Sequence, residues 1–190
     1  MILYHTGFLE IREPDVYRGR KNADFGQGFY LTADQEFARR WAKDRDGEQV
    51  ILNTYELDTE GLRIQEFCRD EKWFTYISGN RAWEPDASDA DVIIGPIAND
   101  TIYDTFGIIT SGVLAPEEAM RLLMIGPEYR QIALKTEKAA SRLKWLSAEV
   151  IETGALKEYR ETVLAEQTAY QKELAEALVS LTHSLRWTCV

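Results

Sequence analysis

The chain has 190 residues, 45 % of them hydrophobic, and a formal net charge of −10, which suits one packed domain with a possible appendage and disfavours diffuse binding to a nucleic-acid backbone. Its two cysteines match no metal or disulfide spacing, no apolar run is long enough to span a membrane, and no secretory leader precedes the first apolar run. We therefore expect a cytoplasmic protein that holds no metal and contacts no membrane.

The N-terminal segment predicts a short strand followed by a basic loop. Residues 1–5 are apolar up to His5, which stands directly before Thr6 and Gly7. A single histidine at a strand end is more often structural than functional. The loop over residues 11–24 carries Arg20 among other basic residues, so it either neutralises a pyrophosphate or is simply solvated.

The stretch DFGQGFYLTADQEFARRWA, residues 24–42, predicts a glycine-rich turn, a short strand and a helix. Thr32 is a good N-cap, and Gln35 three positions later completes a capping box. Glycines let the backbone approach a ligand closely, and Tyr30 directly after them is placed to stack on a flat ring. A plain strand-turn-helix with Tyr30 in the core is equally compatible with this spacing.

The middle of the chain alternates apolar strands with helical segments, and Thr136 is placed to cap the helix that follows the last strand. We expect strands at residues 50–57, 62–64, 91–97 and 131–134, and helices at residues 67–83, 99–106 and 116–126.

Residues 138–185 are helical in composition, and apolar residues recur every three or four positions from Tyr170 to Leu185. A helix of about thirty residues is long for a small domain. It either folds back on the core or pairs with another chain. We therefore divide the chain into a core at residues 1–145 and a helical C-terminal extension at residues 146–190.

Four motifs occur in order along the first 145 residues: Leu-Tyr-His at 3–5, Arg-x-Asn-x-Asp-Phe-Gly-x-Gly-Phe-Tyr-Leu-Thr at 20–32, Asp-Val-Ile-Ile-Gly-Pro at 91–96, and a late strand-to-helix segment at 131–139. The glycine-rich motif and the early histidine resemble the His-Tyr-Glu class of ADP-ribosyltransferases. The wider pattern resembles an uncharacterised bacterial family of that superfamily, DUF3990. The resemblance implies an α+β fold with a split mixed β-sheet and flanking helices, to which the long C-terminal helical segment is added.

The resemblance also implies a site for NAD, with His5, Tyr30 and Gln131 as catalytic residues. The imidazole would bind the adenine ribose, and Tyr30 would stack on nicotinamide. Thr6 stands where the class usually has glycine, and Gln131 where it has glutamate. A neutral amide stabilises a developing cation less than a carboxylate does. The NAD-binding set implied is His5, Thr6, Gly7, Arg20, Asp24, Phe25, Gly26, Gly28, Phe29 and Tyr30.

The function implied is that of an NAD-dependent mono-ADP-ribosyltransferase, in the manner of a toxin or effector. It would cleave the nicotinamide–ribose bond and transfer ADP-ribose to a macromolecular acceptor, for which the acidic surface favours a protein over nucleic acid. Two alternatives stay open: an NAD glycohydrolase that uses the same site, and a non-catalytic interaction module with a degenerate NAD site. The C-terminal helices are a candidate surface for an antitoxin or for self-association.

Overall fold

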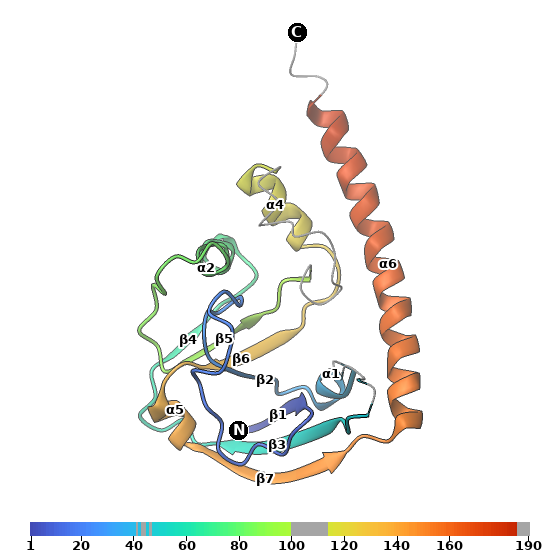
Figure 1. The fold of residues 1–190 in the computed structure, drawn as a ribbon. Coiled ribbons are helices and arrows are strands. Elements are labelled where there is room, and N and C mark those ends of the chain that lie inside the picture. Colours follow the sequence, from blue (N-terminus) through green and yellow to red (C-terminus); the bar gives the residue numbers. More distant parts are fainter. Residues whose placement is uncertain (41, 43–44, 46, 100–113, 186–190) are drawn as a thin grey trace.

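The structure is a computed structural model of the whole chain (Figure 1). It describes the chain except for residues 41, 43–44, 46, 100–113 and 186–190, and it describes only the backbone of residues 181–185. The helix that we expect at residues 99–106 lies almost entirely outside the described residues.

The first sheet has three antiparallel strands in the order β1-β3-β7. They are β1 (Ile2–Gly7), β3 (Ile51–Leu57) and β7 (Leu143–Val150). The central strand β3 alternates buried and exposed side chains towards its end, as a strand does when one face packs on a core.

The second sheet has four strands in the order β2-β6-β5-β4. They are β2 (Phe29–Leu31), β4 (Ile64–Glu66), β5 (Val92–Pro96) and β6 (Arg130–Leu134). The pairs β2–β6 and β6–β5 are antiparallel, whereas β4 runs parallel to β5, so this sheet is mixed.

A single bridge joins the two sheets. Tyr4 N–H donates to Thr32 O at 2.8 Å, and Thr32 N–H donates to Tyr4 O at 3.0 Å. Beyond this rung β1 pairs only with β3 and β2 only with β6. The described chain is therefore an α+β fold with a split sheet, as the sequence predicts.

Five helices flank the sheets in the described part of the chain: α1 (Gln35–Arg40), α2 (Glu71–Arg81), α4 (Pro116–Leu123), α5 (Glu137–Ser141) and α6 (Thr153–Leu185). Figure 1 shows α2 and α4 over the face of the second sheet that is turned away from the first sheet, and α6 along one side of both.

Two buried clusters separate these layers. One lies between the sheets and includes Leu3, Tyr55 and Ile132. The other lies between the second sheet and the helices α2 and α4, and it includes Trp73 and Ala133. Since the second sheet is covered on both faces, its central strand β5 and the second half of β6 are apolar.

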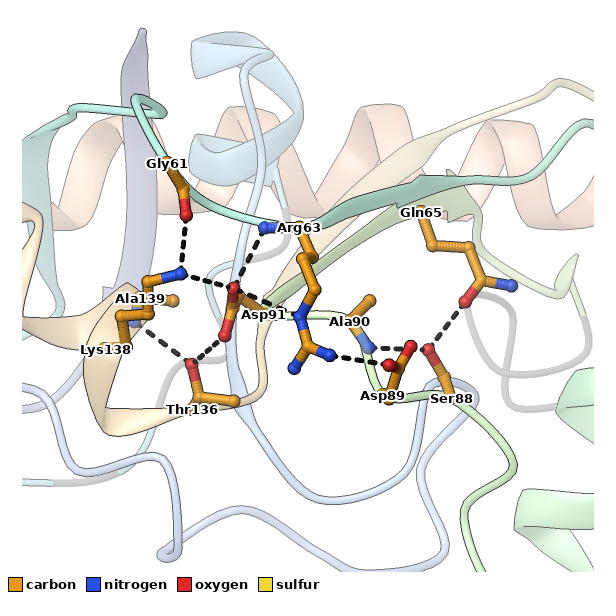
Figure 2. A network of polar contacts seen from close by, with 10 residues as sticks. All are labelled: Gly61, Arg63, Gln65, Ser88, Asp89, Ala90, Asp91, Thr136, Lys138 and Ala139. Atoms are coloured by element: carbon orange, nitrogen blue, oxygen red, sulfur yellow. Dashed lines mark hydrogen bonds and ion pairs between the residues drawn. The ribbon is translucent and has the colours of Figure 1, made fainter.

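Asp91, directly before β5, makes polar contacts with three neighbouring residues at one end of the second sheet (Figure 2). Its carboxylate accepts hydrogen bonds from Arg63 N–H at 2.9 Å, Thr136 Oγ1 at 3.0 Å and Lys138 Nζ at 3.1 Å. The backbone bond from Arg63, with help from Lys138 and Thr136, lowers the pKa of Asp91 to about 2. This carboxylate therefore links β4, β5 and α5 through its charged form.

Two predictions of local structure are wrong. Residues 143–150 form β7, not part of a helix, because pairing with β3 in the first sheet outweighs their helical composition. Asp34 rather than Thr32 caps α1: its Oδ1 accepts Phe37 N–H at 2.9 Å, while Thr32 Oγ1 donates to Arg130 O at 3.1 Å.

The long helix α6 folds back on the core over much of its length. Leu156 and Tyr170 are buried, and α6 contacts α1 and α4. Glu166 accepts a hydrogen bond from Tyr129 OH at 2.9 Å and pairs with Arg40. The sequence allows a hairpin that folds back on the core, whereas the structure has one continuous helix packed on it.

Candidate functional site

His5 lies directly after the rung where the two sheets separate. Its Nδ1 is 2.8 Å from Tyr30 O, and its ring contacts the Phe29 ring at a centroid distance of 4.7 Å. Burial lowers the pKa of His5, although the bond to Tyr30 O opposes this. Because a carbonyl oxygen only accepts, Nδ1 carries the proton, and the neutral ring leaves Nε2 as an acceptor without a partner among the described residues.

Neither of the two residues after His5 hydrogen-bonds that nitrogen. Thr6 Oγ1 donates to Ala38 O in α1 at 2.6 Å, so the Thr6 hydroxyl binds the helix. At Gly7 a Cβ atom would lie 3.5 Å from His5 Nε2. Replacing the usual glycine of the class by Thr6 therefore leaves His5 Nε2 unoccupied.

The hydroxyl of Tyr30 makes two hydrogen bonds within its own glycine-rich turn. It donates to Gly26 O at 2.6 Å and accepts from Phe25 N–H at 3.0 Å. Burial raises the pKa of Tyr30, and the negative charge of Asp24 raises it further. The phenol is therefore protonated at neutral pH, and its ring packs against the cluster beneath α2.

Close packing explains the glycines of this motif without a ligand. Gly26 has a φ of +69°, which favours glycine. At Gly28 a Cβ atom would lie 2.7 Å from Leu134 O of β6. The turn thus presses its backbone directly against the neighbouring strand.

Asp24, which the resemblance places in the NAD site, is saturated by the protein itself. Its Oδ1 pairs with Arg81 at 2.6 Å, its Oδ2 accepts Ala98 N–H at 3.1 Å, and its backbone oxygen accepts from Asn80 at 3.0 Å. With 5 % of Asp24 exposed, the carboxylate holds the turn to α2 and to the end of β5. Arg20, by contrast, is exposed, and its side chain makes no hydrogen bond or ion pair with a described residue.

Gln131 lies on β6, buried in the second sheet. Tyr30 pairs with Ala133, two positions along β6, so Gln131 and Tyr30 face the same side of the sheet. In the described part of the chain the Gln131 Nε2 atom is buried without a hydrogen-bond partner. Buried amide groups rarely lack a partner.

The structure therefore brings the three predicted catalytic residues onto neighbouring strands. His5 is linked to Tyr30 by the hydrogen bond to the Tyr30 carbonyl oxygen. Its imidazole packs against Phe29, whose side chain faces the opposite side of β2 from the side chain of Tyr30. Phe25 and Phe29 are both core residues.

A cluster that the sequence does not reveal surrounds Gly26. Lys135 Nζ donates to Phe25 O and pairs with Asp86 Oδ2 at 2.9 Å, and Asp86 Oδ1 accepts from Tyr76 OH at 2.6 Å. Burial lowers the pKa of Lys135 and raises that of Tyr76. No local pattern pairs residues so far apart in the sequence, so only the fold shows the cluster.

A cavity of about 490 Å³ opens between α2 and the loop at residues 84–88. Gln65, Phe67, Tyr76 and Ser88 are among the residues that line it, whereas His5, Tyr30 and Gln131 are not.

Over the residues that the structure describes, no three metal-ligating side chains converge. None of the described helices is long and apolar enough to cross a membrane.

Residues 1–145 match the family described as "Protein of unknown function (DUF3990)". No curated protein matches the chain.

Proposed function

The chain belongs to the DUF3990 family of proteins of unknown function, and from that membership we propose that it is an NAD-dependent mono-ADP-ribosyltransferase with its site around His5, Tyr30 and Gln131. The acceptor is a macromolecule, with protein favoured over nucleic acid by the net charge of −10. A role as a toxin or effector belongs to the same proposal.

One observation carries the proposal: the His5–Tyr30 contact at the point where the sheets separate. The 2.8 Å bond from Nδ1 to the Tyr30 carbonyl fixes the imidazole and leaves Nε2 able to accept a hydrogen bond from a ribose hydroxyl. The early histidine, the Gly-x-Gly-Phe-Tyr motif and the late Gln131 come from distant parts of the sequence and stand on neighbouring strands.

In the proposed reaction the bond between ribose C1′ and the nicotinamide nitrogen breaks, and its electron pair leaves with nicotinamide. The acceptor atom forms the new bond to C1′, and its proton passes to solvent. Polar groups that orient the substrate and stabilise the transition state, rather than a protein nucleophile, provide the catalysis. Gln131 can hold a ribose hydroxyl, but its neutral amide gives the developing cation less support than a carboxylate would.

The neutral Gln131 favours a second candidate, a non-catalytic interaction module with a degenerate NAD site. NAD glycohydrolysis differs from transfer only in using water as the acceptor. The same assay separates all three functions, because they differ in nicotinamide release and in transfer of label.

The test incubates the full chain with NAD labelled in the adenosine part and with a protein extract, and measures free nicotinamide and label on macromolecules. Transfer that is lost in His5→Ala supports the proposal. Release of nicotinamide without transfer indicates hydrolysis, and absence of NAD binding indicates the module.

The matched test of Gln131 is the substitution Gln131→Glu. It is expected to raise the rate of nicotinamide release by about tenfold or more, since it adds charge where the cation forms. Gln171→Glu, at an exposed position on α6, is the control and should change nothing. An unchanged rate in both His5→Ala and Gln131→Glu would remove this site assignment.

A further inference from the structure

The cavity between α2 and residues 84–88 has the build of a ligand site. Its wall on the helix side is made by Thr75, Tyr76 and Gly79, and the loop forms the opposite wall. A volume of about 490 Å³ lies within the range of small-molecule sites in proteins. The Glu84 side chain covers Gly79, since a Cβ atom there would lie 3.0 Å from Glu84 Oε2. The slot between the helix and the loop therefore opens beside Thr75.

The Gln65 carboxamide lines the cavity, and Figure 2 shows the neighbours that orient it. Ala90 N–H donates to Ser88 Oγ at 3.2 Å, and Ser88 Oγ donates to Gln65 Oε1 at 2.6 Å. The carboxamide oxygen of Gln65 is therefore already hydrogen-bonded within the chain. Its Nε2 keeps two N–H donors, has no partner among the described residues, and belongs to a side chain that lines the cavity.

The rest of the interior is aromatic and fixed in place. The Phe67 and Tyr76 rings stack at a centroid distance of 4.9 Å. Asp86 in the loop accepts from Tyr76 OH at 2.6 Å and pairs with Lys135 at 2.9 Å. The first contact holds the loop against α2 and the second holds it against the end of β6, so the slot is formed before any ligand enters.

The charges at the mouth select against anions. Glu71, Lys72 and Glu84 line the cavity and are exposed. Two carboxylates and one ammonium group leave a net negative mouth, since Asp86 is already paired with Lys135. A phosphate group would be repelled there.

We propose that this cavity binds a neutral planar molecule of nucleoside size, with a carbonyl oxygen or ring nitrogen that accepts from Gln65 Nε2. The ring lies in the slot between the helix and the loop, against the Phe67–Tyr76 pair. The inference goes beyond the proposed function, because His5, Tyr30 and Gln131 take no part in the cavity.

Calorimetric titration with adenosine tests the site in the full chain. It is carried out in a His5→Ala background, so that binding at the proposed NAD site does not contribute. We expect a Kd below about 1 mM, and binding of AMP that is weaker by about tenfold because of the negative mouth.

Two variants in the same background locate the ligand. Gln65→Leu is expected to weaken adenosine binding by about tenfold, the cost of one lost hydrogen bond to a desolvated partner. Gln171→Leu is its matched control and should leave the Kd unchanged. Thr75→Trp places a large side chain in the slot at an exposed helix position and should abolish binding.

The inference is overturned by either of two results: no binding of adenosine to His5→Ala, or binding that survives both Gln65→Leu and Thr75→Trp. AMP binding as tight as adenosine overturns the choice of a neutral ligand. Adenosine that binds the unsubstituted chain but not His5→Ala removes this site and leaves the proposed function standing.

Discussion

Asp24 and His5 both belong to the NAD site that the resemblance implies, but the structure uses their polar atoms in opposite ways. Both carboxylate oxygens of Asp24 are bound by the protein, to Arg81 and to Ala98 N–H. His5 commits only Nδ1, and its Nε2 stays unoccupied among the described residues. A polar side chain that is saturated from within holds the fold together, whereas one with an open atom is available to a ligand.

The largest effect expected from this comparison is on stability, at Asp24. Asp24→Ala removes the buried carboxylate that pairs with Arg81 and should lower the free energy of unfolding by about 3–5 kcal/mol. Urea denaturation at neutral pH measures the loss. Asp89→Asn removes a carboxylate that is 90 % exposed and should cost at most about 0.5 kcal/mol. Equal stability of the two variants would contradict the structural role of Asp24.

The glycine-rich turn should respond next. Gly28→Ala places a Cβ atom 2.7 Å from Leu134 O, and this overpacking is expected to cost about 1–3 kcal/mol. The control is Gly154→Ala in α6, where a Cβ atom meets nothing within 4 Å. That change should stabilise the protein by about 0.5–1 kcal/mol, since alanine is the better helix former. If thermal unfolding showed Gly28→Ala to be harmless, close packing would not explain this glycine.

Asp91, like Asp24, is a carboxylate bound by the protein, and its contribution to stability should depend on pH. Its folded pKa of about 2 lies below the ordinary value of 3.8, so the folded state favours the charged form. The stability that Asp91 contributes is complete above pH 4 or so and is lost as the pH falls towards about 2. Asp91→Asn should therefore be less stable at neutral pH and lose less stability on acidification. Parallel stability curves for the two proteins between pH 5 and about 2 would rule out this linkage.

The smallest effect on stability is expected at Arg20. Its exposed side chain makes no hydrogen bond or ion pair with a described residue, so Arg20→Ala should change the free energy of unfolding by at most about 0.5 kcal/mol. If Arg20 binds the pyrophosphate as the resemblance implies, the same change should weaken NAD binding by about tenfold, through loss of a charged hydrogen bond. Arg18→Ala, in the same exposed loop, is the control. Equal NAD affinity of the two variants would exclude Arg20 from the site.

Local signals in the sequence predict much of the fold correctly. Pro116 begins α4, Thr136 caps α5 by accepting Ala139 N–H at 3.2 Å, and the apolar run at 91–97 contains the buried strand β5. Each signal acts within a few residues. Pro at the first turn, a hydroxyl at an N-cap and a β-branched run have the same local effect in most folds.

The misassigned elements depend on distant partners. Leu143–Val150 carries lysine, leucine, alanine and glutamate, which favour helices, yet it forms β7 because β3 offers a strand edge with which to pair. Thr32 is a suitable helix cap, but its hydroxyl donates a hydrogen bond to Arg130 O on β6. In both cases a contact across the fold outweighs a local preference.

For the candidate site, the sequence identified residues but not which of their polar atoms are hydrogen-bonded within the fold. Tyr30 was equally compatible with a ligand platform and a core position, and the structure shows its hydroxyl bound within its own turn. The Lys135–Asp86–Tyr76 cluster and the Gln65 cavity have no motif, because their members come from separate elements that meet only in the folded chain.

The sequence alone determined the family, the α+β class, most of the element positions and the identity of His5, Tyr30 and Gln131 as residues of interest. These follow from short-range spacing and from a pattern of motifs. Only the tertiary structure decided which of their atoms are occupied, that residues 143–150 complete a sheet, and where a cavity remains. Hydrogen-bond saturation and packing are properties of atoms brought together from distant positions, and no local pattern encodes them.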